Sequence, residues 1–106
     1  MRLKDKVVVI TGGANGIGAV TASLFGKQGA KLAIVDFDEQ AGEKKVKELQ
    51  EAGVEALFYQ VDVASHADVK DVAKRVLTHF EKVDVLINNA GIIAYKLIRR
   101  KLLPYF

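Results

Sequence analysis

The chain has 106 residues, with 16 Lys and Arg, 13 Asp and Glu and no cysteine, and half of its residues are apolar. Such a composition is typical of an ordinary globular domain, and the length suits one domain or part of one. The lack of cysteine excludes a disulfide framework, a thiolate zinc site and a cysteine nucleophile. No apolar run approaches the roughly 18 residues that span a bilayer, and the run at residues 7–10 is too short for the core of a signal peptide. We therefore expect no membrane span and a reducing, cytoplasmic setting.

The net charge of +3 is confined to the end of the chain. Residues 1–91 hold 12 basic and 13 acidic side chains, whereas residues 92–106 hold four basic side chains and no acid. A nucleic-acid footprint needs a basic stripe along a folded face, and residues 1–91 offer none. We therefore expect no nucleic-acid partner.

The chain begins with a strand, a helix and a second strand. The β-branched run at residues 7–10 predicts a strand buried on both faces, as in a parallel sheet. The apolar residues of the segment 17–25 predict a helix, which Gly29 ends in the C′ position. A second buried strand is expected at residues 32–35 and ends at Asp36.

The same alternation continues through the rest of the chain. The pattern predicts a second helix, which Asp38 caps and Gly53 ends, followed by a strand at 56–61. The third predicted helix begins with the capping box Ser65-x-x-Asp68 and carries an apolar stripe over 69–80. A fourth strand is expected at 83–87. Strands separated by helical crossovers indicate an α/β fold with a parallel, doubly wound sheet.

A glycine-rich turn lies between the first strand and the first helix. Gly12 allows a sharp turn out of the strand, Gly16 lets a pyrophosphate approach the backbone, and Gly18 lets the helix pack tightly on the sheet. The helix N-terminus offers N–H groups and a partial positive charge to phosphates. The alternative is that the glycines only punctuate a tight loop between strand and helix.

Asp36 follows the second strand, 18 residues beyond Gly18. A carboxylate there can accept hydrogen bonds from both ribose hydroxyls of an adenosine and repels a 2′-phosphate, which favours NAD over NADP. Asn15 and Phe37 occupy the places where a basic residue would help to bind that phosphate. The alternative is that Asp36 is only a surface acid beside a helix. Asp38 can fill that role instead.

Three motifs in order resemble the short-chain dehydrogenase/reductase family. Thr11-Gly12-x-x-x-Gly16-x-Gly18 resembles its T-G-x-x-x-G-x-G motif, Asp62-Val63 its adenine-contacting position, and Asn88-Asn89-Ala90-Gly91 its N-N-A-G motif. The resemblance implies the amino-terminal half of a Rossmann domain with strand order 3-2-1-4, and NAD-dependent oxidoreduction of an alcohol/carbonyl substrate. Right-handed crossovers then put the first two helices on one face of the sheet and the third on the other. The cofactor-binding residues that we predict on these grounds are Gly12, Asn15, Gly16, Ile17, Gly18, Asp36, Asp62, Val63, Asn89, Ala90 and Gly91.

The family's catalytic residues have no counterpart in this chain. In the family a Tyr followed by Lys four residues later moves the proton, and a Ser orients the substrate. None of Tyr59, Tyr95 and Tyr105 has Lys at that spacing, and both Ser23 and Ser65 are interpreted as structural. We therefore predict no catalytic residue, no metal site and no turnover by the chain alone. The competing hypothesis is an inactive NAD-binding fragment, or a subunit that a partner completes.

The resemblance ends near residue 93, so we expect a dinucleotide-binding half-domain over 1–93 and a basic, apolar tail over 94–106. A truncated or frame-shifted product with an unrelated tail is our preferred interpretation. Alternatives are a native amphipathic helix, or a basic helix on a membrane surface. The apolar stripe of such a helix would consist of Ala94, Leu97, Ile98, Leu102 and Tyr105. The fourth strand would have an unpaired edge, so we expect self-association unless the tail covers Leu86 and its neighbours.

Overall fold

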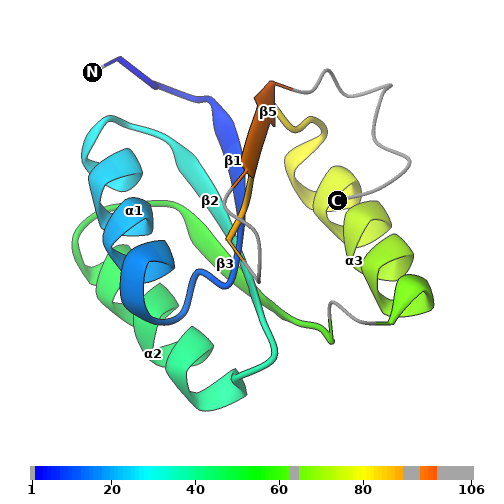
Figure 1. Cartoon of the computed structure of the whole chain (residues 1–106). Coiled ribbons are helices and arrows are strands. Elements are labelled where there is room, and N and C mark those ends of the chain that lie inside the picture. The colour runs from blue at the N-terminus through cyan, green and yellow to red at the C-terminus, as the bar shows by residue number, and fades with distance from the viewer. Residues whose placement is uncertain (1, 63–64, 90–93, 98–106) are drawn as a thin grey trace.

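The computed structural model describes residues 2–62, 65–89 and 94–97. The elements of this part of the chain are β1 (Val7–Thr11), α1 (Gly16–Lys27), β2 (Lys31–Asp36), α2 (Glu39–Glu51), β3 (Ala56–Gln60), α3 (His66–Phe80), β4 (Val85–Asn88) and β5 (Ala94–Leu97). The strands form one sheet in the order β3-β2-β1-β4-β5 (Figure 1). Strands β1 to β4 are parallel to one another, which confirms the predicted α/β class and the order 3-2-1-4.

The two faces of the sheet carry different helices, as predicted. Figure 1 shows α1 and α2 on one side of the sheet and α3 on the other. Val7 and Val9 of β1 pack in the cluster formed with α3, whereas Val8 and Ile10 pack in the cluster formed with α1 and α2. Successive side chains of a strand point to opposite faces, so a strand covered on both sides must be apolar throughout. This explains the unbroken β-branched run of β1.

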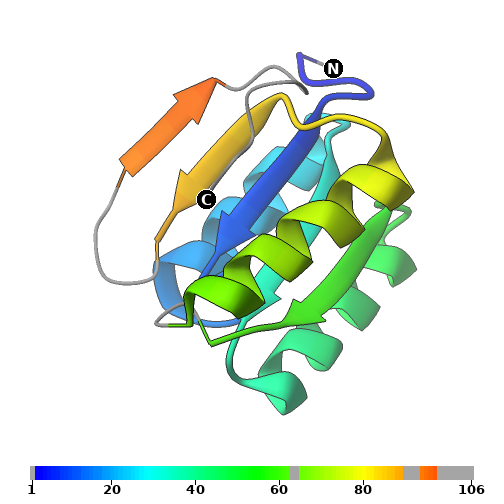
Figure 2. The same cartoon turned by 90° about the vertical axis from the view of Figure 1, so that its right-hand side faces the viewer.

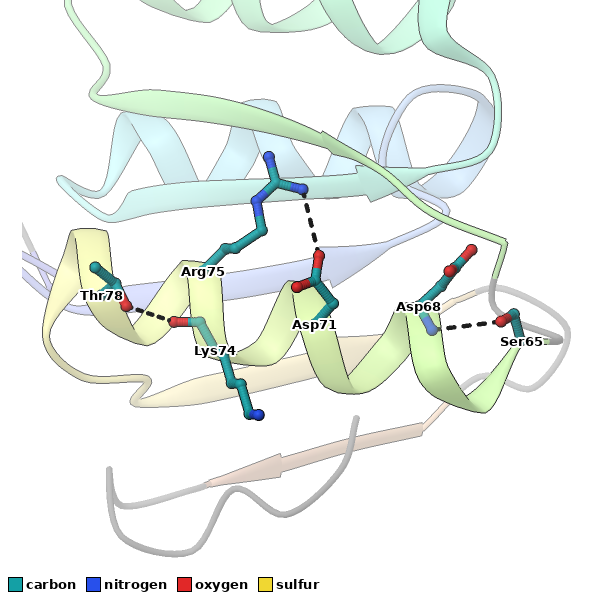
Figure 3. Close-up of polar contacts among 6 residues, drawn as sticks. All are labelled: Ser65, Asp68, Asp71, Lys74, Arg75 and Thr78. Atoms are coloured by element: carbon teal, nitrogen blue, oxygen red, sulfur yellow. Dashed lines mark hydrogen bonds and ion pairs between the residues drawn. The ribbon is translucent and has the colours of Figure 1, made fainter.

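The predicted helix ends are confirmed. The side chain of Asp38 accepts a hydrogen bond from the backbone N–H three residues later, at the start of α2. Ser65 does the same at the start of α3, at 3.3 Å (Figure 3). Gly29 and Gly53 follow the C-caps of α1 and α2 with φ of 90° and 84°, a conformation that suits glycine.

Arg75 ties α3 to the outer strand β3. Its guanidinium lies 5.2 Å from the ring centroid of Tyr59 in β3, and it pairs with Asp71 at 3.9 Å on the exposed surface of α3 (Figure 3). Burial raises the pKa of the Tyr59 hydroxyl, and the positive charge of Arg75 opposes that shift. The contact holds α3 above the edge of the sheet.

The predicted start of the fourth strand was wrong by two residues. Strand β4 begins at Val85 rather than at Val83, although Val83 is buried. The physical reason is Asp84, whose backbone N–H donates to the Val7 carbonyl and whose carboxylate accepts from the Val7 N–H, each at 2.9 Å. A side chain therefore takes the place of a backbone partner at this end of the β1–β4 ladder. Burial would raise the pKa of Asp84, but the Val7 N–H and Lys82 outweigh it and lower that pKa.

The expectation of an unpaired edge on the fourth strand was also wrong. Strand β5 pairs antiparallel with β4, with Asn88 opposite Ala94 and Val85 opposite Leu97 (Figure 2). An open strand edge leaves N–H and C=O groups without partners, and β5 satisfies those of β4. The alternative of an amphipathic helix is therefore wrong for residues 94–97, and its remaining residues lie outside the described part of the chain. On the α1 side, Val85 and Ile87 remain only partly buried.

We predict that β5 stabilises the sheet. Truncation after residue 93 should lower Tm by about 5 °C or more and increase self-association, because it removes one hydrogen-bonded ladder and exposes an apolar edge. Thermal unfolding and size-exclusion chromatography measure both effects. Truncation after Leu97, which keeps β5, is the matched control. If the chain that ends at residue 93 has the same Tm and the same elution volume as the full chain, β5 does not stabilise the sheet.

Candidate functional site at the carboxyl ends of the strands

The carboxyl ends of β1 to β4 meet at one edge of the sheet. In the observed register Thr11 of β1 lies between Val35 of β2 and Asn88 of β4, and Asp36 lies opposite Gln60 of β3. From this edge β1 leads to α1 on one face, whereas β3 leads to α3 on the other. The strand order therefore reverses between β1 and β4, which is where open α/β sheets form their ligand crevice.

Thr11 connects β1 to the end of β4. Its side chain is buried, with 2% of the residue exposed. The hydroxyl donates to the Asn88 side-chain oxygen at 2.9 Å and accepts from the Asn89 backbone N–H at 2.9 Å. The Asn89 side-chain amide in turn donates to the Gly12 carbonyl at 3.4 Å. From the sequence we assigned Thr11 no role of its own. The signal that could have revealed one is a hydroxyl residue at the end of an otherwise apolar, buried strand.

Gly18 has no room for a side chain. A Cβ built at this position would lie 2.0 Å from the Gly12 carbonyl oxygen and 2.8 Å from the Asn89 side-chain nitrogen. The close packing predicted at Gly18 is thus an approach of the first turn of α1 to the backbone of its own loop. Because the obstacle is a backbone carbonyl, a larger residue would have to move the loop or the helix.

The N-terminus of α1 is open toward the surface. Gly12 and Gly16 have φ of 67° and 56°, and no atom lies within 4 Å of a Cβ built at Gly16. Asn15 occupies the N-cap, but its side chain makes no capping hydrogen bond, and the first turn contains no acid. The first N–H groups of a helix have no partner within the helix, so here no capping side chain competes with an anion for them. These residues fit a phosphate group.

Asp36 is drawn toward this loop by its own hydrogen bonds. One carboxylate oxygen accepts from the Ala14 N–H at 3.1 Å, and the other accepts from the Asp38 N–H at 3.0 Å. The acid thus lies beside the glycine-rich turn and holds it in place. The Asn15 amide donates to Asp38, at 3.5 Å, on the same side of the loop. Phe37, between the two acids, is exposed.

The remaining predicted residues fall into two groups. Ile17 is exposed on the first turn of α1, and Asp62 is exposed just after β3, where the Val61 N–H donates to the Asp36 carbonyl. Val63, Ala90 and Gly91 lie outside the described residues.

Within residues 2–62, 65–89 and 94–97, no group of acids and histidines is arranged to hold a metal ion. The helices of these segments include none that is long and apolar enough to cross a bilayer.

Two hollows flank α1. One of about 270 Å³ lies beside the glycine-rich turn, between Ala14, Asn15 and Gly16 on one side and Lys44 and Lys45 of α2 on the other. A larger cleft of about 460 Å³ lies at the opposite end of the same helices, lined by residues such as Gly26, Gly53 and Val54. The larger cleft adjoins neither Asp36 nor Asn89, so size alone does not place the site. The open helix N-terminus and the strand ends make the glycine-rich turn the candidate site.

Comparison with known proteins decides the family. Residues 6–102 match the family model described as short chain dehydrogenase. The chain belongs to the short-chain dehydrogenase family. The match continues past residue 93, where the sequence analysis places the start of the tail.

Named relatives span much more sequence than this chain. An uncharacterized oxidoreductase of Thermotoga maritima is 41% identical over 96 residues, which are 91% of this chain and 38% of the relative. Short chain aldehyde dehydrogenase 1 of Euphorbia lathyris is 43% identical over 91 residues, or 86% and 31% of the two chains. This member of the family therefore spans about a third of the length of such relatives.

Solved structures show the same fold. The chain superposes on NAD⁺-bound xylitol dehydrogenase with a TM-score of 0.84 and 36% identity, over 87% of this chain and 35% of the other. A short-chain dehydrogenase/reductase of Burkholderia phymatum in complex with NAD gives a TM-score of 0.82 and 38% identity, over 87% and 33%. The parallel sheet and its helices are thus those of the family's Rossmann-like fold.

We predict that the Thr11 hydroxyl stabilises the edge where β1 and β4 end. Thr11→Val keeps the shape of the side chain but leaves the partly buried Asn88 side-chain oxygen without its donor, so the free energy of unfolding should fall by about 1–3 kcal/mol. Urea unfolding measures the loss. Thr11→Ser, which keeps the hydroxyl, is the matched control and should lose less. If the Val variant is as stable as the Ser variant, the hydroxyl does not hold this edge together.

Proposed function

We propose that this chain binds NAD at the carboxyl ends of its strands and forms the cofactor-binding part of an oxidoreductase for alcohol/carbonyl substrates. The single observation that carries the proposal is the pairing of an uncapped α1 N-terminus with the Asp36 carboxylate across the glycine-rich turn. A dinucleotide needs both: a place for its negative phosphates and a hydrogen-bond acceptor for its ribose.

The pyrophosphate is assigned to the turn between β1 and α1. The absence of atoms around the Gly16 Cβ position gives a phosphate oxygen access to the backbone there. The backbone N–H groups of Ile17 and Gly18 lie in the first turn of α1, at the positive end of its dipole. Gly12 supplies the turn that brings the chain from the sheet to this helix.

The adenosine ribose is assigned to Asp36. Each oxygen of a carboxylate can accept more than one hydrogen bond, so the two bonds from Ala14 and Asp38 leave capacity for two ribose hydroxyls. A 2′-phosphate at the same place would meet the negative charge of Asp36. Lys45 of α2, which is partly buried, donates to the Ser23 hydroxyl at 2.6 Å and lies 3.6 Å from the Glu48 carboxylate, so its ammonium group already has two partners within this chain.

The remaining contacts are proposed from the family motifs. Asp62 and Val63 would contact the adenine, and Asn89, Ala90 and Gly91 would line the other ribose. The position of Asn89 supports its part, because its amide is already anchored on the Gly12 carbonyl beside the turn.

The cofactor, when bound, supplies the hydride chemistry, and the residues of this chain bind and orient it. Proton transfer to or from the substrate needs a separate acid or base, and the chain contains no Tyr with Lys four residues later. We therefore propose that the chain alone binds the nucleotide without turnover, and that activity needs further residues. We also propose a cytoplasmic setting, which the lack of cysteine in this sequence favours.

The Asp36 carboxylate should make the chain prefer NAD to NADP. We expect Asp36→Ala to narrow that preference by about tenfold or more, because the variant loses a charged acceptor and its repulsion of the 2′-phosphate. Isothermal titration with both nucleotides measures the ratio of the two Kd values. The matched control is Glu55→Ala, which removes an exposed acid at the amino edge of the sheet and should leave that ratio unchanged. Equal affinity of the unmutated chain for both nucleotides would refute the assignment.

A further inference from the structure

The larger of the two hollows, the cleft of about 460 Å³, lies between the C-terminal ends of α1 and α2. The two helices lie side by side on one face of the sheet (Figure 1), and the glycine-rich turn is at the other end of α1. The volume of the cleft falls within the roughly 300–1,000 Å³ that small-molecule sites occupy. The proposed function assigns it no role, because it adjoins neither Asp36 nor Asn89.

Close packing fixes the apolar part of the cleft. Gly26, in the last turn of α1, approaches the loop after α2 so closely that a Cβ built on it would lie 2.9 Å from a Val54 methyl group. Ala30 and Leu49, which line the same cleft, are buried. A lining packed in this way is formed before any ligand arrives, and apolar ligand atoms gain free energy when they leave water for such a surface.

The charged part of the lining consists of three lysines and one acid, which are Lys4, Lys27, Lys45 and Glu48. The side chain of Lys45 is only 12% exposed. Its ammonium group donates to the Ser23 hydroxyl at 2.6 Å and lies 3.6 Å from the Glu48 carboxylate. An ammonium group has three N–H donors, so these two partners leave one donor for a ligand. Lys4 and Lys27 are exposed, and their flexible side chains can reach a bound anion.

The backbone carbonyls at the two helix ends are already occupied. The Phe25 carbonyl accepts from the Gln28 and Ala30 N–H groups, at 3.0 and 3.2 Å, and the Leu49 carbonyl accepts from the Val54 N–H at 2.9 Å. Each helix C-terminus contributes about half a negative charge, so three ammonium groups, one carboxylate and two helix ends leave an excess of about one positive charge. The cleft therefore offers hydrogen-bond donors and a small positive charge, which suit a monoanion.

We propose that this cleft binds a small organic monoanion, a carboxylate on a compact apolar body. The carboxylate lies against the ammonium groups of Lys27 and Lys45, and the apolar body lies against Leu49 and Val54. A dinucleotide does not suit the cleft, because its many ribose hydroxyls would lie against an apolar lining, and burying polar groups without partners is costly. The inference is independent of the proposed function and is tested without NAD.

Nuclear magnetic resonance of the isotope-labelled full chain, titrated with benzoate, tests the proposal. Benzoate carries both parts of the proposed ligand. The amide signals of Gly26, Gly53 and Val54 should shift together and saturate with a Kd of about 10 mM or tighter, the range expected for so small a ligand. Benzamide and benzylammonium keep the ring without the negative charge, and acetate keeps the charge without the ring. Each of the three should bind about fivefold more weakly than benzoate, or not at all.

Substitution of single lysines tests the assigned contacts. Lys27→Met and Lys45→Met each remove one ammonium group, and each should weaken benzoate binding about threefold or more. Lys47→Met is the matched control and should leave the Kd unchanged, because Lys47 is exposed on α2 and does not line the cleft. Lys45→Met also takes a partner from Ser23 and Glu48, so its Tm is measured first. If that variant unfolds, Lys27→Met, at an exposed position, decides the outcome.

Three results would overturn the proposal. The first is benzoate that leaves the cleft amides unmoved or shifts only the glycine-rich turn. The second is an analogue among benzamide, benzylammonium and acetate that binds as tightly as benzoate. The third is a Lys27→Met variant that binds benzoate as tightly as the Lys47→Met variant does. None of these measurements involves NAD, so a failure here leaves the proposed nucleotide site standing, and a failure of that site leaves this cleft standing.

Discussion

The contact between Gly18 and the Gly12 carbonyl is the constraint on which the candidate site depends. It fixes where α1 begins relative to the end of β1, because a Cβ at Gly18 would lie 2.0 Å from that oxygen. The helix can approach so closely only without a side chain at this position. Its first turn then remains at the strand ends with no capping side chain, and the same Gly12 carbonyl anchors the amide of Asn89. One close backbone approach therefore positions both the glycine-rich turn and the end of β4.

Two polar ties keep this arrangement from opening. The buried Thr11 hydroxyl connects β1 to Asn88 and Asn89, and the Asp36 carboxylate connects β2 to the turn through Ala14. A buried polar group that loses its partner costs about 1–3 kcal/mol, a large part of the roughly 5–15 kcal/mol that stabilises a domain. The residues that shape the candidate site thus also hold three strands to one loop, so we expect changes in them to affect stability as well as the proposed binding.

Local rules explain why so much of the fold was predicted from the sequence. The β-branched run of β1, the side chains of Asp38 and Ser65 at their helix starts and the glycines after α1 and α2 are each decided by neighbours within a few residues. The strand order followed from the resemblance to a Rossmann domain, and the right-handed crossovers then predicted which helices cover each face of the sheet. The glycine-rich turn and Asp36 could be proposed as cofactor-binding because each directly follows a strand that the sequence itself predicts.

Non-local contacts explain what was missed. The start of β4 depends on Asp84 bonding to Val7, which is distant in the sequence, and β5 pairs with β4 through residues whose charge and hydropathy also suit a helix. The apolar residues of α1 predicted the helix, but their spacing did not reveal which side would stay exposed. That required knowing what else covers the sheet.

Nuclear magnetic resonance of the isotope-labelled full chain, titrated with NAD, tests the central claim most directly. The amide signals of Gly12, Gly16, Gly18, Asp36 and Asn89 should shift together and saturate with one Kd. Those of Gly26, Gly53 and Val54, in the larger cleft at the other end of α1 and α2, should not move. Shifts concentrated in that cleft, with the glycine-rich turn unaffected, would contradict the assignment of the nucleotide to the carboxyl ends of the strands.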